Sequence, residues 1–157
     1  MWKPPSQPII KDMLMTGSHP IDAERAFARA KRTRRRAALA RMLRREPAEC
    51  SRLKVYDERK VRRSGGHLHG IREIPLQAID GTLEAGKAKQ FDRDFRPASA
   101  AGTRWQRVWI AEQTGAVLPP ISVVPTGDGY AVRDGHHRVS VARARGATTI
   151  DAEVLAA

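Results

Sequence analysis

The part of this chain best suited to chemistry is a run of four residues, Gly135, His136, His137 and Arg138. They stand where a short strand pattern at 130–133 gives way to a helical pattern at 137–145. The first turn of a helix leaves backbone N–H groups unpaired and carries a partial positive charge. Gly135 lets an anion approach the backbone, and Arg138 adds a guanidinium. The sequence therefore predicts a phosphate-binding turn at these residues.

The same run contains the candidate catalytic side chain, His137. A helix dipole lowers the pKa of an imidazole and a bound triphosphate raises it, so we expect His137 to titrate between about pH 6 and pH 8 and to act as an acid or phosphate donor. Adjacent residues on a helix point in different directions, and spacing supplies no third ligand, so we predict no protein-built metal site. A Mg²⁺ ion held by phosphate oxygens and one carboxylate remains open. His67 and His69, in a glycine-rich loop, are assigned to a solvated turn.

The elements that position this turn follow it and precede it in a regular order. Ile71 to Ile79 alternates and contains Pro75, which predicts an edge strand because proline donates no ladder hydrogen bond. Gly115 is placed to end a helix at 102–113, and Gly127 and Gly129 mark a hairpin turn. Further strands are predicted at 119–125, 130–133 and 149–154. This order predicts an α/β (α+β) fold with a mixed sheet.

Positive charge is concentrated in the first half of the chain. The 157 residues carry 29 Lys and Arg against 17 Asp and Glu, a net charge of +12, and nearly all of the excess lies before residue 71. A helix is predicted from Pro20 to Glu46, with an apolar stripe at Ala23, Phe27, Ala30, Ala38, Leu39, Met42 and Leu43. Between Arg25 and Arg45 the basic residues are uninterrupted by any acid.

Such a helix predicts salt-dependent binding of a polyanion. Nucleic acid, DNA in preference to RNA, is the expected partner, and a membrane is not, because the apolar stripe is mostly alanine. The candidate nucleic-acid-binding residues are Arg29, Lys31, Arg32, Arg34, Arg35, Arg36, Arg41, Arg44 and Arg45.

Length and composition favour one domain with an appended arm. We expect a flexible lead at 1–19, a basic helical arm and linker at 20–70, and the catalytic or binding domain at 71–157. The single cysteine, Cys50, excludes an intramolecular disulfide and a Cys-based zinc cluster and favours a reducing compartment. With no apolar run of membrane-spanning length and no signal-peptide pattern, a cytoplasmic location is expected.

Several motifs in this order resemble the ParB/sulfiredoxin superfamily. They are Ile74-Pro75-Leu76, Leu118-Pro119-Pro120-Ile121, Asp134-Gly135-His136-His137-Arg138 and Ile150-Asp151-Ala152-Glu153-Val154, and the resemblance extends over about half of the chain. In ParB partition proteins the corresponding turn is Gly-Glu-Arg-Arg and grips the triphosphate of CTP. In sulfiredoxin it is Gly-Cys-His-Arg and serves ATP-dependent repair of a cysteine sulfinic acid. His136 stands at the position of that cysteine, which removes the sulfiredoxin reaction because an imidazole supplies no thiolate.

The resemblance is to short, stand-alone ParB-like proteins, some described as nucleases, and to ParB-fold kinases that act on free serine. It implies a nucleoside triphosphate, CTP or ATP, at 135–138, with Arg93 or Arg96 reaching its phosphates. It also implies a carboxylate base, Glu84 or Asp92, and pairing into a homodimer. Three functions remain open. They are a DNA-associated nucleotide-binding protein with NTPase or nuclease activity, a small-molecule kinase, and a non-enzymatic regulatory or partner-binding module.

Overall fold

The computed structural model describes residues 17–64 and 70–155, and a six-stranded mixed sheet forms its centre, in the order β1-β3-β5-β4-β6-β2. The strands are β1 (Lys54–Val55), β2 (Gly70–Pro75), β3 (Ile79–Thr82), β4 (Ile121–Pro125), β5 (Tyr130–Asp134) and β6 (Thr149–Val154). The α-helices are α1 (His19–Leu43), α2 (Glu58–Ser64), α3 (Gly102–Gln113) and α4 (His136–Ala144). Short 3₁₀ helices lie at η2 (Ala48–Ser51), η3 (Leu76–Ala78), η4 (Ala85–Lys89) and η5 (Ser99–Ala101). The predicted mixed α/β fold behind a basic helix is confirmed.

The sheet contains both the edge strand and the hairpin that the sequence predicts. The predicted edge strand is β2, which pairs antiparallel with β6 from Gly70 opposite Val154 to Pro75 opposite Thr149. The predicted hairpin joins β4 to β5, which pair antiparallel. Its turn closes through the Thr126 N–H, which donates to the Gly129 carbonyl at 2.8 Å. β5 also pairs in parallel with β3, so the start of α4 lies where β5 leaves the middle of the sheet.

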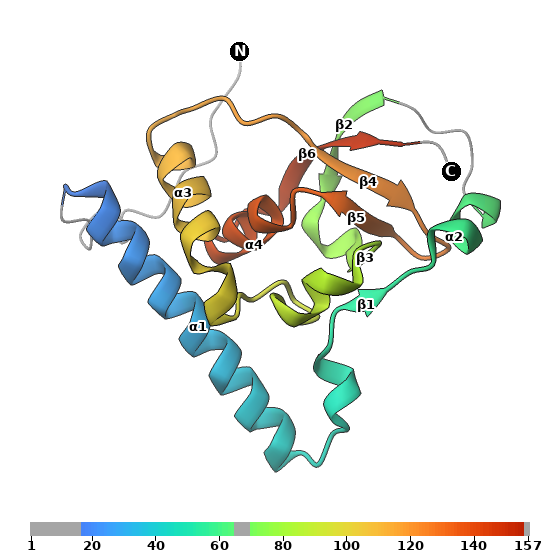
Figure 1. Ribbon diagram of the computed structural model, residues 1–157, viewed down its shortest axis with the longest axis horizontal. Helices are drawn as coiled ribbons and strands as arrows, with labels where there is room; N and C mark the ends of the chain where they lie inside the picture. Colours follow the sequence, from blue (N-terminus) through green and yellow to red (C-terminus); the bar gives the residue numbers. More distant parts are fainter. Residues whose placement is uncertain (1–16, 65–69, 156–157) are drawn as a thin grey trace.

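Three helices lie together on one side of this sheet, with α3 between α1 and α4 (Figure 1). Trp105 of α3 is fully buried, and its ring centroid lies 5.4 Å from that of Phe27 on α1. The indole Nε1–H of Trp105 donates to the Ser140 Oγ of α4 at 2.9 Å, which satisfies both polar groups inside the core. The core therefore holds the start of α4 through α3.

Only the first half of α1 packs against this core. Ala23, Ala26, Phe27 and Ala30 are buried, whereas none of residues 31–43 is. Leu39, Met42 and Leu43 are 57%, 73% and 78% exposed, so the second half of the predicted apolar stripe is wrong as a packing face. At 1.5 Å per residue the helix is about 37 Å long, and its far end extends beyond the rest of the protein (Figure 1).

Residues on both sides of the predicted boundary between the arm (20–70) and the domain (71–157) share one buried cluster. Ala23, Phe27 and Leu53 belong to the same cluster as Trp105 and Val139. β1, which also precedes that boundary, pairs in parallel with β3 in the central sheet. Residues 1–16 of the predicted lead, together with His67 and His69, lie outside the described residues. In the described ranges no helix is long and apolar enough to cross a membrane.

Candidate functional site

The predicted phosphate-binding turn is the start of α4. Gly135 is its N-cap residue, with φ +102°, a conformation that side chains other than glycine rarely adopt. A Cβ atom there would lie 2.5 Å from Cγ2 and 2.8 Å from Cβ of Ile121, so the turn has room for glycine alone. Within the described residues no side chain accepts a capping hydrogen bond from the first N–H groups of α4. The start of α4 therefore keeps the donors and the positive dipole end that an anion requires.

A small cleft of about 260 Å³ opens at this turn. Its lining comes from the end of β3, η4, α3, β5 and the first turn of α4. The residues are Glu84, Lys87, Arg104, Val108, Asp134, Gly135, His136, His137 and Arg138. Three of the lining side chains are cations and two are carboxylates, so the cleft is positive before the helix dipole is counted.

The structure brings together all four residues of the predicted turn and Glu84. Two of the three cations, Lys87 and Arg104, were not among the site residues predicted from the sequence. Lys87 belongs to a polar stretch without periodicity, and Arg104 lies on a helix with other arginines. No local sequence pattern distinguishes Lys87 and Arg104 from the other charged residues near them. They reach the same cleft only because α3 and η4 pack beside α4.

Arg138 is held at this cleft by groups on neighbouring segments. Its Nη1 donates to the Pro119 carbonyl, and its Nη2 lies 3.3 Å from the Asp134 carboxylate. The side chain is 13% exposed, and burial lowers the pKa of Arg138. The guanidinium is thus fixed at the turn with one carboxylate partner.

His136 is a buried positioning residue. It is 2% exposed, its ring stacks near Phe91 and Phe95, and its Nε2 lies 2.6 Å from the Thr82 Oγ1. The same hydroxyl oxygen accepts the Glu84 N–H at 2.9 Å, so Thr82 connects His136 to the backbone of the carboxylate in the cleft. Burial, and then the charge of Lys87, lowers the pKa of His136 to about 3.

His137 also lies in a dry environment. It is 7% exposed, and its ring meets Phe91 edge-on at a centroid distance of 5.1 Å. Burial, followed by the charges of Lys87 and Arg104, lowers the pKa of His137 to about 4. Without a bound anion His137 is therefore neutral at neutral pH, which places its titration below the range predicted from the sequence.

The two candidate bases have different surroundings. Glu84 lines the cleft, whereas Asp92 is 2% exposed and does not. Its Oδ1 accepts the N–H groups of Asp94 at 3.0 Å and Arg96 at 2.9 Å. Asp92 thus accepts hydrogen bonds within its own turn, and of the two candidate bases only Glu84 lines the cleft with His137.

The two arginines expected at the phosphates, Arg93 and Arg96, do not line the cleft either. Arg93 Nη1 donates to the Cys50 carbonyl at 3.3 Å, and Arg96 Nη1 lies 2.7 Å from the Asp94 carboxylate. The loop that carries them turns its charged groups toward η2 and the middle of α1, because Phe91 and Phe95 anchor its apolar side beneath the histidines.

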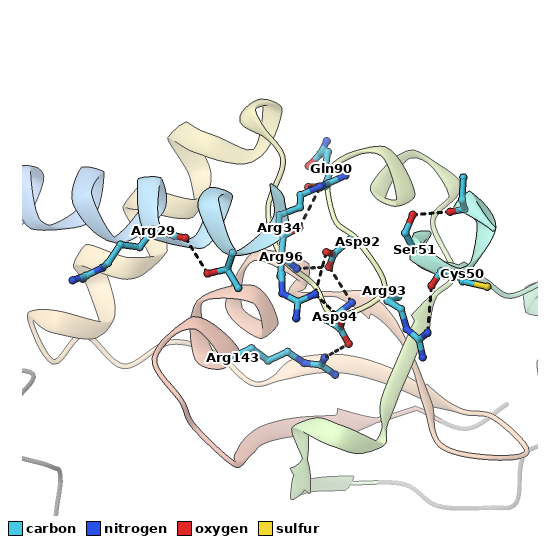
Figure 2. Close-up of polar contacts among 12 residues, drawn as sticks. Arg29, Arg34, Cys50, Ser51, Gln90, Asp92, Arg93, Asp94, Arg96 and Arg143 are labelled. Atoms are coloured by element: carbon cyan, nitrogen blue, oxygen red, sulfur yellow. Dashed lines mark hydrogen bonds and ion pairs between the residues drawn. The ribbon is translucent and has the colours of Figure 1, made fainter. Parts of the chain in front are cut away.

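Some basic residues of α1 and of the two residues that follow it contact other groups, and others are exposed without an ion pair. Arg34 Nη1 donates to the carbonyls of Gln90 at 3.3 Å and Arg96 at 3.2 Å (Figure 2). Lys31 lies over the Phe27 ring at 5.1 Å, Arg44 pairs with Glu46 at 2.7 Å, and Arg41 is half-buried. Among the described residues of this segment, the exposed arginines without an ion pair are Arg25, Arg29, Arg32, Arg35, Arg36 and Arg45.

Metal-ligand side chains do not gather in the described ranges. No group of three or more His, Cys, Asp or Glu residues there is arranged to hold an ion. Glu84 and Asp134 are the oxygen donors nearest the predicted phosphate site.

The site and fold define a mixed α/β protein with a cationic cleft at a helix start. No protein-family model matches the chain, and no curated protein matches it. Among solved structures it is similar to the crystal structure of sulfiredoxin from Arabidopsis thaliana, with 19% identity and a TM-score of 0.41. The match covers 56% of this chain and 86% of that chain. At this level the likeness concerns the fold, and the function has to be argued from the cleft itself.

Proposed function

We propose that this chain binds the phosphate groups of a nucleoside triphosphate, CTP or ATP, in the cleft at the start of α4. The observation that carries the proposal is the convergence of Lys87, Arg104 and Arg138 on a helix N-terminus that no side chain of the described residues caps. Charged donors and a helix dipole directed at one small space favour a polyvalent anion over any neutral ligand.

The size of the cleft suits part of a nucleotide. Its volume of about 260 Å³ is below the range of about 300–1,000 Å³ typical of pockets that enclose a whole drug-sized ligand. The phosphate chain therefore occupies the cleft, while the base and ribose lie outside it. Glu84 and Asp134 supply the carboxylate oxygens that a Mg²⁺ ion accompanying the nucleotide would use.

Calorimetric titration with CTP and with ATP, with and without Mg²⁺, tests this proposal. Lys87→Gln and Arg104→Gln should each weaken binding by about 1.5–3 kcal/mol, because each removes a charge-assisted contact to phosphate. Arg107→Gln is the matched control, since Arg107 is exposed on the same helix as Arg104 and does not line the cleft. Equal affinities in all three variants and the wild type would remove the assignment of the cleft.

The second part of the proposal is association with DNA through the exposed arginines of α1. Half of the helix extends beyond the core, and Arg32, Arg35 and Arg36 are exposed on it with no ion pair among the described residues. Each phosphate contact releases condensed counterions, so such binding weakens as salt is added.

Substitution tests this part better than truncation, because deleting residues 1–46 would remove Ala23 and Phe27 from the core. The double variant Arg35→Gln/Arg36→Gln should lower the slope of log affinity against log salt for duplex DNA by about 2. Arg59→Gln/Arg107→Gln has the same net charge and removes exposed arginines elsewhere. Equal slopes for the two double variants would place the DNA contact away from α1.

A phosphotransferase activity is the second candidate, and the position of Glu84 favours it. A hydroxyl group of a small substrate would lose its proton to Glu84 while its oxygen bonds to the γ-phosphorus and the bond to the bridging oxygen of the diphosphate breaks. Glu84→Gln should then abolish transfer from ATP to free serine, followed by thin-layer chromatography, while nucleotide affinity measured without Mg²⁺ is retained. A wild-type protein that binds nucleotide without transfer, hydrolysis or DNA cleavage would instead be a regulatory or partner-binding module.

A further inference from the structure

A second and larger cavity, of about 680 Å³, lies near the other end of α4. Arg143, in the last turn of that helix, lines it, whereas the cleft described above lies at the first turn. Seven residues at 1.5 Å each separate His136 from Arg143, or about 10 Å along the axis. The lining residues are Glu49, Cys50, Arg52, Leu53, Lys54, Gln77, Ile79, Asp80, Arg93, Asp94 and Arg143.

The charges around this cavity are unevenly matched. Arg52 and Arg93 have no carboxylate partner among the described residues, and the one hydrogen bond shown for the Arg93 side chain goes to the Cys50 carbonyl (Figure 2). Lys54 lies over the Tyr56 ring at 4.5 Å. The lining also contains three carboxylates, Glu49, Asp80 and Asp94. Asp94 is engaged by Arg96 at 2.7 Å and approached by Arg143 at 4.0 Å, and the Asp80 Oδ2 accepts the hydroxyl group of Tyr56. Against these stand four cations, Arg52, Lys54, Arg93 and Arg143, so the lining carries one positive charge in excess and favours an anion.

Arg143 forms a fixed part of the wall. Its Nη2 donates to the carbonyls of Leu76 at 2.7 Å and Ile79 at 2.9 Å, and its guanidinium carbon lies 5.3 Å from the centre of the Phe95 ring. The Arg143 Nε is buried without a hydrogen-bond partner in the described part of the protein, and so is the Asp80 Oδ1. Buried polar atoms are normally satisfied, so both atoms indicate a wall that is incomplete without a ligand. A phosphate oxygen would accept from the Arg143 Nε, whereas the Asp80 Oδ1 requires a donor, which a hydroxyl group on the body of the ligand would supply.

The volume of the cavity, about 680 Å³, lies within the range for pockets that enclose a small organic molecule. Leu53 and Ile79 form its apolar floor but are 2% and 1% exposed, so the apolar area that they present is small. Guanidinium groups bind phosphate and carboxylate oxygens in pairs, and several cations around one cavity favour a dianionic phosphate over a single carboxylate.

From these observations we propose that the cavity between η2, β3 and the end of α4 binds a phosphate monoester on an apolar or aromatic body, with the size of a mononucleotide. Arg52, Arg93 and Lys54 would contact the phosphate, and Leu53 and Ile79 would contact the body. The same chemistry is present in a free mononucleotide and in the 5′-phosphorylated end of a nucleic acid. This inference does not rest on the function proposed for the first cleft.

Titration of the full chain with CMP and with cytidine tests the proposal. Cytidine should bind at least 10-fold more weakly than CMP, and Arg52→Gln/Arg93→Gln should weaken CMP binding at least 10-fold. Both arginines are exposed, so the fold should tolerate the change, which circular dichroism melting checks. Arg59→Gln is the control of an exposed arginine outside the cavity.

A second double variant separates this site from the first cleft. CMP binding should survive Lys87→Gln/Arg104→Gln, even if that variant shows the nucleotide proposal for the cleft to be wrong. If CMP binding is lost in the cleft variant, or is unchanged in Arg52→Gln/Arg93→Gln, the proposed second site does not exist.

Single-stranded DNA of one sequence, with and without a 5′-phosphate, distinguishes the two possible ligands, a free mononucleotide and the 5′-phosphorylated end of a nucleic acid. Tighter binding of the phosphorylated strand, lost in Arg52→Gln/Arg93→Gln, supports the proposal with a nucleic-acid end as the ligand. Equal binding of the two strands together with cavity-dependent CMP binding supports it with a free mononucleotide.

Discussion

Gly135→Ala is the substitution whose effect the geometry of the turn defines most closely. The residue holds φ +102° and caps α4, and its hypothetical Cβ would lie 2.5 Å and 2.8 Å from two carbon atoms of Ile121. Ile121 is itself fully buried in β4, the first strand of the β4–β5 hairpin. An added methyl group at residue 135 therefore meets a side chain that has little space to retreat.

Two separate costs add up at this position. A left-handed backbone conformation costs a residue other than glycine roughly 1–2 kcal/mol. Forcing a methyl group into a packed core costs about 1–3 kcal/mol more. The expected loss of roughly 2–5 kcal/mol is a large part of the 5–15 kcal/mol that typically stabilises a domain.

Gly115→Ala separates these two costs. Gly115 has φ +72° and nothing within 4 Å of its hypothetical Cβ, so alanine there should lose only the backbone part, roughly 1–2 kcal/mol. Urea denaturation followed by tryptophan fluorescence measures both variants, since Trp105 and Trp109 are buried. Equal losses at the two positions would mean that Ile121 moves aside and that the steric argument for glycine at the turn is wrong.

Binding gives a second measurement on the same variant. The hypothetical Cβ would also lie 3.0 Å from the Arg138 Nη2, so the guanidinium has to shift in Gly135→Ala. Protein that is still folded at low temperature should therefore bind nucleotide more weakly than Gly115→Ala, which leaves Arg138 in place.

Other consequences of the structure are equally open to measurement. The folded-state pKa values of about 3 for His136 and about 4 for His137 lie below the unfolded value of 6.5. The contribution of these neutral histidines to the free energy of unfolding is therefore complete above about pH 6.5 and falls as the pH drops toward 4. Denaturation at several pH values should show a slope of up to about 2.7 kcal/mol per pH unit for two such groups, and a flat profile over this range would contradict their burial. Thr82→Val should cost about 1–3 kcal/mol by unpairing the His136 Nε2 and the Glu84 N–H, whereas Thr82→Ser should retain most of the stability in the same assay. Phe27→Ala should cost about 3–5 kcal/mol in thermal or urea unfolding even though it lies on the basic helix, and losses no larger than those of an exposed site would show that α1 is detached.

Much of the fold is predictable because its boundaries have local chemical causes. Gly115 adopts the positive φ expected at the end of α3, and Gly146 does the same after α4. Pro75 correctly marks the edge strand, since β2 forms one side of the sheet. The start of α4 is also visible in the sequence, because a strand pattern, a glycine and a helical pattern meet there.

The rest depends on contacts between distant segments. β3 escapes prediction because Ile79-Asp80-Gly81-Thr82 is short and half polar, and its pairing with β5 is what makes it a strand. Leu39, Met42 and Leu43 have the spacing of a buried stripe, but α1 extends past α3 before it reaches them. Local spacing also cannot show that Arg93 and Arg96 turn away from the histidines, since the direction of that loop is set by Phe91 and Phe95 beneath it.

The loop from Phe91 to Arg96 packs its two aromatic side chains on the two histidines, while its charged side chains bind one another and approach Arg143. The positive charge of the cleft comes from Lys87, Arg104 and Arg138. The loop therefore positions the imidazoles and contributes no cation to the cleft.

His136 holds the turn against β3. The side chain is 2% exposed, burial lowers its pKa to about 3, and its Nε2 lies 2.6 Å from the Thr82 Oγ1. A buried neutral imidazole whose Nε2 is already engaged is a poor nucleophile. Glu84 and His137, the candidate acid–base residues, line the same cleft as the three cations. A bound nucleotide should raise the pKa of His137, so that the imidazole becomes protonated only when phosphate is present. NMR of the His137 ring with and without nucleotide measures this protonation, which would link binding to chemistry. A resonance that does not shift on nucleotide binding would assign His137 a packing role.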